Sequence, residues 1–99
     1  MNYQNIPQEL HSSIKGAKYE LLACAWLLDQ GYEVFRNVCP TGKGDLIIWK
    51  KGISPIVIDV KSGGISKVKG VLTLRYQNGE FSWLNSKNER IESPITKDI

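Results

Sequence analysis

Residues 44–61 read GDLIIWKKGISPIVIDVK and decide the fold of this 99-residue chain. The stretch holds two apolar runs, Asp45–Trp49 and Ile56–Val60, separated by a short turn with one glycine and one proline. Short apolar runs rich in β-branched side chains predict two buried strands near the centre of a sheet. If the two strands fold back on each other as an antiparallel pair, Asp45 lies beside Asp59.

The second strand ends in the pattern Asp59-Val60-Lys61. Side chains alternate between the two faces of a strand, so Asp59 and Lys61 point to one face and Val60 to the other. We therefore expect Asp45, Asp59 and the backbone carbonyl of Val60 to hold Mg²⁺, which prefers hard oxygen ligands, and we expect Mn²⁺ to substitute for it. Lys61 is placed to orient or deprotonate an attacking water and to offset negative charge at a phosphodiester.

A helix is predicted before this strand pair. Ser12 or Ser13 can cap its start, and it runs to about Gln30, where Gly31 stops it. Its second half, Leu21–Leu28, is apolar all round and therefore requires cover on more than one side. An apolar stripe at helical spacing is formed by Ile14, Ala17, Leu21, Ala25 and Leu28.

The remaining elements are predicted to be strands. Tyr32–Val38 is rich in β-formers, and Val71–Tyr76 and Glu80–Leu84 are joined by an Asn-Gly turn typical of a hairpin. Ser62–Gly70 is basic, contains three glycines and is too short for a full crossover helix. The pattern predicts an α/β fold: an N-terminal helix on a mixed, largely antiparallel sheet, with a C-terminal hairpin in place of a crossover helix.

Length and composition limit the possible classes of protein. We expect a single domain, residues 1–99, with a core at about 12–84 and a polar tail at 85–99 that holds a helical turn around Lys87–Ile91. Two cysteines and one histidine predict neither a disulfide framework nor a zinc site. The chain has no apolar run of membrane-spanning length and no signal-peptide pattern, so we expect a cytoplasmic protein without membrane contact.

Positive charge is concentrated in the middle of the chain. Between Arg36 and Arg75 there are eight basic residues and two acids, a net charge of +6, whereas the whole chain carries +3. The two acids are Asp45 and Asp59. Such a segment predicts DNA as a partner, and the alternative is a solvated lysine-rich surface. The candidate DNA contacts are Lys43, Lys67, Lys69, Arg36 and Arg75.

Glu20 is a fourth candidate for the site. On the helical wheel it lies at the edge of the apolar stripe, close to Gly16, Cys24 and Leu27. A carboxylate beside so much apolar surface requires a partner, which a metal ion or its bound water can provide. The alternative is a surface glutamate near the start of a helix, where acids are favoured.

Three segments together resemble the PD-(D/E)XK nuclease superfamily: Ile14–Glu20, Gly44–Ile48 and Ile56–Lys61. Within it, the likeness is to the small Holliday-junction-resolvase-like enzymes, and it covers about residues 12–62. The resemblance implies a restriction-endonuclease-like core and Mg²⁺-dependent cleavage of DNA. By that likeness Asp45 and Asp59 are the metal ligands. Lys61 is the catalytic lysine, and Glu20 is the helix glutamate.

Three functions are compatible with these patterns. The first is a metal-dependent DNA endonuclease; one small chain offers one active site, so we expect a homodimer formed through the apolar half of the helix or the Val71–Leu84 hairpin. The second is a catalytically inactive nucleic-acid-binding module of the same fold, with exposed aromatic side chains at Tyr76, Phe81 or Trp83. The third is a structural or partner-binding domain whose aspartate and lysine form a surface ion pair.

Overall fold

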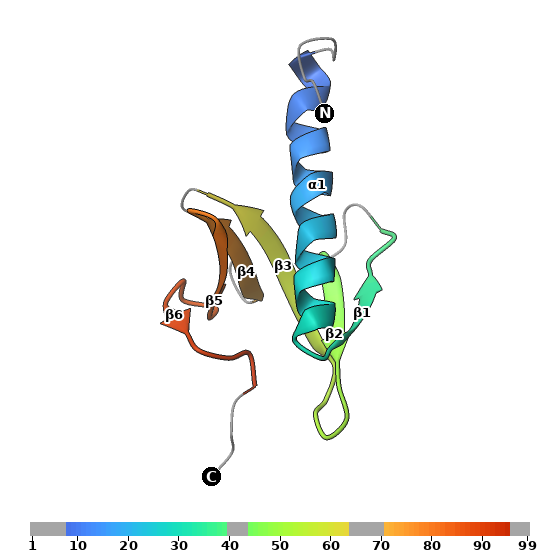
Figure 1. The fold of residues 1–99 in the computed structure, drawn as a ribbon, viewed down its shortest axis with the longest axis vertical. Coiled ribbons are helices and arrows are strands. Elements are labelled where there is room, and N and C mark those ends of the chain that lie inside the picture. The colour runs from blue at the N-terminus through green and yellow to red at the C-terminus, as the bar shows by residue number, and fades with distance from the viewer. Residues whose placement is uncertain (1–7, 40–43, 64–70, 96–99) are drawn as a thin grey trace.

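The computed structural model describes residues 8–39, 44–63 and 71–95. In these ranges one helix packs on a six-stranded sheet whose strands follow one another in sequence order (Figure 1). All neighbouring strands are antiparallel except β3 and β4, which are parallel. This arrangement confirms the predicted α/β fold with a mixed, largely antiparallel sheet. The elements are α1 Gln8–Asp29, β1 Glu33–Arg36, β2 Leu46–Trp49, β3 Ile56–Ser62, β4 Leu72–Gln77, β5 Glu80–Leu84 and β6 Arg90–Ile91.

Helix α1 ends where the sequence predicts but begins earlier. Gly31 has a φ of +89° and donates to the carbonyl of Leu28 at 3.0 Å, while Tyr32 donates to that of Leu27 at 3.1 Å. These two bonds form a Schellman motif, in which a left-handed glycine closes the helix. The predicted start at Ser12 or Ser13 is wrong, because the helix begins at Gln8. Serine is tolerated inside helices, so a capping residue alone does not locate a first turn.

The helix buries a different face from the predicted stripe. Ala23 and Leu27 are fully buried and belong to the core, with β2 and β3 beneath them. Leu21 and Leu28 belong to the predicted stripe, yet they are 57% and 59% exposed. Because this half of the helix is apolar all round, its periodicity cannot select the buried face. The contact with the sheet selects it, and a small residue such as Ala23 permits close approach.

The predicted hairpin is present as β4 and β5. Asn78 and Gly79 both have positive φ, 55° and 82°, as a two-residue hairpin turn requires. Trp26 of α1 packs over this hairpin, with ring centroids 5.4 Å from Phe81 and 6.1 Å from Trp83. The aromatic side chains therefore anchor the C-terminal half of the sheet to the helix.

The predicted helical turn around Lys87–Ile91 is wrong. The side-chain oxygen of Asn85 accepts hydrogen bonds from the backbone N–H groups of Lys87 and Glu89, both at 2.9 Å. These bonds close a tight turn that returns the chain to pair with β5 as strand β6. The Ser62–Gly70 loop predicted between β3 and β4 lies almost wholly outside the described residues. Within the described part, no helix combines the length and apolar character needed to cross a bilayer.

Candidate functional site

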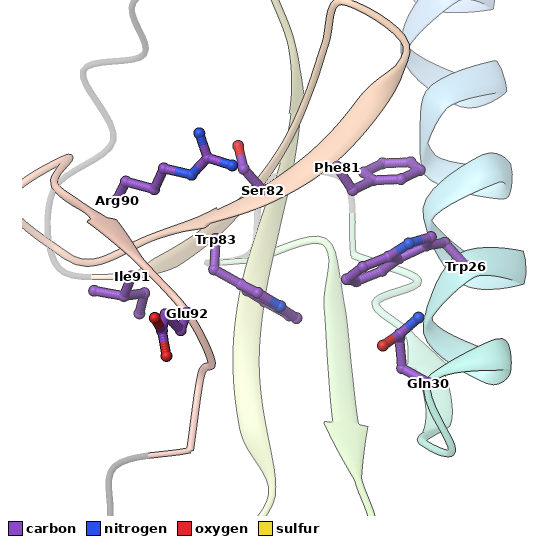
Figure 2. Close-up of a pocket in the computed structure, with 8 residues that line it drawn as sticks. All are labelled: Trp26, Gln30, Phe81, Ser82, Trp83, Arg90, Ile91 and Glu92. Atoms are coloured by element: carbon purple, nitrogen blue, oxygen red, sulfur yellow. The ribbon is translucent and has the colours of Figure 1, made fainter.

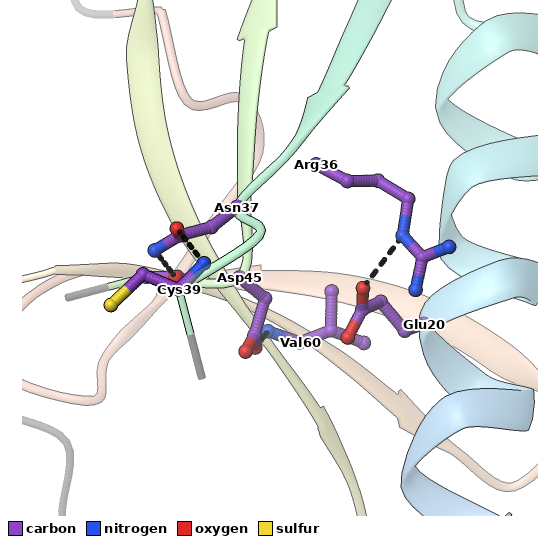
Figure 3. A network of polar contacts seen from close by, with 7 residues as sticks. Glu20, Arg36, Asn37, Cys39, Asp45 and Val60 are labelled. Carbon is purple, nitrogen blue, oxygen red and sulfur yellow. Dashed lines mark hydrogen bonds and ion pairs between the residues drawn. The ribbon is translucent and has the colours of Figure 1, made fainter. Parts of the chain in front are cut away.

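Strands β2 and β3 pair antiparallel with Leu46 opposite Ile58. Continuing this register by one residue puts Asp45 across from Asp59, as the sequence predicts. Two bonds join the strand ends: the Asp45 N–H donates to the Ile58 carbonyl at 2.8 Å, and the Val60 N–H donates to Asp45 Oδ2 at 2.7 Å. The Asp45 carboxylate is thus held against the end of β3 (Figure 3).

Gly44 permits this close approach of Asp45 to β3. Its φ is +81°, and a Cβ atom built there would overlap Val57 Cγ1 and lie 3.3 Å from the Ile58 carbonyl oxygen. A side chain at this position is therefore strained in two ways, by the backbone conformation and by the contact with β3.

We expect Gly44→Ala to lower the unfolding free energy by about 2–4 kcal/mol and to displace Asp45. Gly52→Ala is the matched control, because Gly52 has a similar φ of +94° with no atom near the added Cβ. Urea denaturation of both variants measures the difference. Equal losses in the two variants would show that the contact with β3 contributes nothing.

Asp59 and Lys61 lie on the face of β3 that points away from α1, since Ile58 and Val60 pack into the core beneath the helix. Asp59 is only 8% exposed. Burial raises the pKa of its carboxyl group, the neighbouring Asp45 charge raises it further, and Lys61 opposes both effects. Asp45, Asp59 and Lys61 therefore share one electrostatic environment at the end of the strand pair.

The donor chemistry of this cluster fits a divalent cation. Asp45 and Asp59 present carboxylate oxygens whose mutual repulsion a cation relieves. Among the residues that the structure describes, no third carboxylate, histidine or cysteine joins them to form a group of three. Mg²⁺ is often held by one or two carboxylates and completes its coordination with water and substrate oxygens, so the two aspartates are compatible with this ion, which stays a prediction.

Glu20 lies apart from Asp59. Its Oε1 accepts from Arg36 Nε at 3.1 Å, so the helix glutamate is paired with the first strand (Figure 3). Glu20 and Asp45 line one cavity of about 280 Å³, to which Asp59 and Lys61 contribute nothing. The structure brings Glu20 to the helix side of Asp45, whereas Asp59 and Lys61 lie on the other face.

Asn37 is a site residue that the sequence analysis missed. Its side-chain Nδ2 donates to the Gly44 carbonyl at 3.0 Å, and its backbone N–H donates to the Asp45 carbonyl at 2.9 Å. Its Oδ1 also accepts from the Cys39 N–H at 2.9 Å. Asn37 therefore ties the end of β1 to the segment that carries Asp45. An asparagine near the end of the predicted strand Tyr32–Val38, where such a residue disfavours further pairing, is the signal that could have indicated this role.

The predicted DNA contacts are described only in part. Lys43, Lys67 and Lys69 lie outside the described residues. Arg36 is 56% exposed while it pairs with Glu20, and a surface pair of this kind contributes little to stability. Arg75 lies in β4, directly opposite Lys61 in the parallel pairing of β3 and β4.

The thiol of Cys24 is unsuited to be a nucleophile. Burial raises its pKa above the ordinary value, and the Glu20 charge raises it too, although Arg36 acts in the opposite direction. A thiol with a raised pKa stays protonated near neutral pH.

Comparison with known proteins identifies the fold. No family model matches the chain, and no curated protein matches it in sequence. The solved structure of a bacterial homing endonuclease, I-Ssp6803I, superimposes with a TM-score of 0.65 over 89% of this chain and 80% of that one, at 14% sequence identity. The two proteins share one fold. The residue roles implied by the PD-(D/E)XK resemblance stay predictions.

Proposed function

We propose that this protein is a divalent-metal-dependent endonuclease of the PD-(D/E)XK type that hydrolyses DNA phosphodiester bonds. The observation that carries the proposal is the meeting of Asp45, Asp59 and Lys61 at one end of the β2–β3 pair. The fold supports it, because the similar solved structure is that of a homing endonuclease.

In this proposal Asp45 and Asp59 hold the cation, together with the Val60 carbonyl, and Glu20 assists from the helix side. Mg²⁺ or Mn²⁺ bound there lowers the pKa of water and stabilises negative charge on the phosphate. Lys61 orients the attacking water and offsets the charge that develops on the phosphate oxygens. The burial of Asp59 excludes solvent, which strengthens these electrostatic effects.

DNA is the proposed substrate because the segment from Arg36 to Arg75 carries a net charge of +6. Arg36 and Arg75, with Lys43, Lys67 and Lys69, are the proposed contacts to the phosphate backbone.

The proposal is tested by incubating the protein with supercoiled, linear and branched DNA in Mg²⁺, in Mn²⁺ and in EDTA. We expect cleavage with either metal and none in EDTA. A protein that binds DNA and never nicks it with either metal would exclude the nuclease function. The three substrates together also measure whether one DNA structure is preferred.

We also propose that the active form is a homodimer. The helix leaves Leu21 and Leu28 more than half exposed, and these side chains offer an apolar stripe for a second subunit. The hairpin is the weaker candidate, since Leu74 and Trp83 are already buried in the core. Sedimentation equilibrium that shows only monomer at high micromolar concentration removes this part of the proposal.

A non-catalytic nucleic-acid-binding role is the second candidate, favoured by a separate cavity of about 550 Å³. Figure 2 shows the rings of Trp26, Phe81 and Trp83 gathered on its α1 side, with Arg90 of β6 and Glu92, which follows β6, across from them. The expectation of freely exposed aromatic side chains on the hairpin is wrong: Trp83 is 6% exposed, and Phe81 packs against Trp26. Binding without cleavage in the assay above would favour this role.

A further inference from the structure

Strand β4 adds a second row of side chains to the candidate site. In the parallel pairing of β3 and β4, Asp59 lies opposite Thr73 and Lys61 lies opposite Arg75. Leu74, between the two β4 residues, is buried in the core beneath α1. Thr73 and Arg75 therefore share the face of the sheet that carries Asp59 and Lys61.

Both β4 side chains hold a buried polar atom without a partner. Thr73 is fully buried, and within the described residues its Oγ1 forms no hydrogen bond. The Nε atom of Arg75 is likewise buried and unbonded there. Buried polar groups are nearly always hydrogen-bonded in folded proteins, because leaving one unpaired costs free energy. Two such atoms on neighbouring positions of one sheet face indicate a place that is completed by a ligand.

The charges of this row indicate the kind of ligand. Lys61 and Arg75 lie directly opposite each other, and like charges in this position repel. In the described part of the chain Arg75 forms no ion pair, and its neighbour on β5 is the uncharged Ser82. An anion that contacts both cations removes the repulsion, and a guanidinium group binds phosphate oxygens through two parallel hydrogen bonds.

We propose that β4 contributes two residues to the active site. Arg75, together with Lys61, binds the DNA phosphate next to the carboxylates of Asp45 and Asp59, and Thr73 positions Asp59. This inference rests on the nuclease function proposed above. Thr73 acts through Asp59 because it is fully buried and cannot itself reach DNA. In the metal-bound protein, the Thr73 hydroxyl group, which lies opposite Asp59 and is otherwise unpaired, donates to that carboxylate and fixes its orientation.

Arg75 is tested by DNA binding in EDTA, where no cleavage occurs. For Arg75→Gln we expect about tenfold weaker binding and a salt dependence reduced by about one phosphate contact. Arg75→Lys retains the positive charge but loses the bidentate hydrogen bonding to phosphate. This variant therefore binds DNA with the wild-type salt dependence and cleaves it more slowly. Lys51→Gln, at an exposed lysine in the turn between β2 and β3, is the control. The assignment is overturned if Arg75→Gln and Lys51→Gln bind DNA alike.

Thr73 is tested by Thr73→Val and Thr73→Ser, followed by thermal unfolding during a Mg²⁺ titration. Valine removes the unpaired hydroxyl, so the metal-free variant is more stable than wild type. It nevertheless needs about tenfold more Mg²⁺ for half of the thermal stabilisation, because residues that orient metal ligands affect affinity to this extent. Serine keeps the hydroxyl and restores the wild-type Mg²⁺ response. A valine variant that responds to Mg²⁺ like wild type overturns the role of Thr73.

The proposed nuclease function and the proposed role of β4 can be disproved independently of each other. If wild-type protein cleaves DNA and neither Arg75→Gln nor Thr73→Val changes binding or the Mg²⁺ response, the β4 inference is wrong and the nuclease function stands. If wild type binds DNA and Mg²⁺ without cleaving, the nuclease function is wrong, and the same two binding measurements still decide whether β4 contributes to the site.

Discussion

Lys61→Ala is expected to reduce DNA cleavage by about three orders of magnitude, whereas DNA binding weakens by only about tenfold, the effect of losing one phosphate contact. Lys61 lies on the same face of β3 as Asp59, and its charge lowers the pKa of that carboxyl group against the effects of burial and Asp45. Its ammonium group is therefore close to the Asp59 carboxylate, where the proposed reaction takes place. Loss of one phosphate contact among several reduces DNA affinity far less than loss of the lysine reduces cleavage.

Single-turnover cleavage rates and filter binding measure the two effects of this substitution. Lys51→Ala is the matched control, because Lys51 is an exposed lysine in the turn between β2 and β3. It removes the same charge from the same part of the chain without touching the site. Equal loss of cleavage in both variants would indicate a general electrostatic effect, and unchanged cleavage by Lys61→Ala would remove the lysine from the mechanism.

Asp59→Asn is expected to abolish cleavage and, in the absence of metal, to stabilise the protein at neutral pH. Burial and the Asp45 charge raise the pKa of Asp59 above its ordinary value of 3.8. The folded state then binds a proton more tightly than the unfolded state. The free energy of unfolding therefore falls as the pH rises from about 3.8, the ordinary pKa, to the raised pKa of the folded state. Above that raised pKa, the full free-energy penalty of the buried, ionised carboxylate is present. The neutral asparagine removes the penalty.

Thermal unfolding in EDTA tests the sign of this effect. The stabilisation by Asp59→Asn is expected to grow from acidic to neutral pH, and Glu80→Gln, which removes an exposed carboxylate outside the candidate site, is the matched control. Added Mg²⁺ stabilises wild type and leaves Asp59→Asn unchanged, since the variant lacks a metal ligand. A variant that is less stable than wild type at neutral pH, or that still responds to Mg²⁺, would exclude Asp59 as a strained metal ligand.

Local signals in the sequence determined a large part of this molecule. The helix stop at Gly31 and the turn at Asn78-Gly79 were predictable because each needs a positive φ, which few residues adopt readily. The pairing of β2 with β3 was predictable because two short apolar runs flank a brief turn. The placement of Asp45 opposite Asp59 followed from that pairing. Side chains alternate between the two faces of a strand, so a shift of register by one residue would expose the apolar side chains.

Only the tertiary structure decided the features that depend on contacts between distant segments. The buried face of α1 was one of these, because apolar residues occur on every side of its second half. Another was the parallel pairing that places Thr73 and Arg75 beside Asp59 and Lys61. Strand alternation indicates which side chains share a face, but it carries no information about which strand becomes the neighbour. That choice depends on the free energy of packing the whole sheet under one helix.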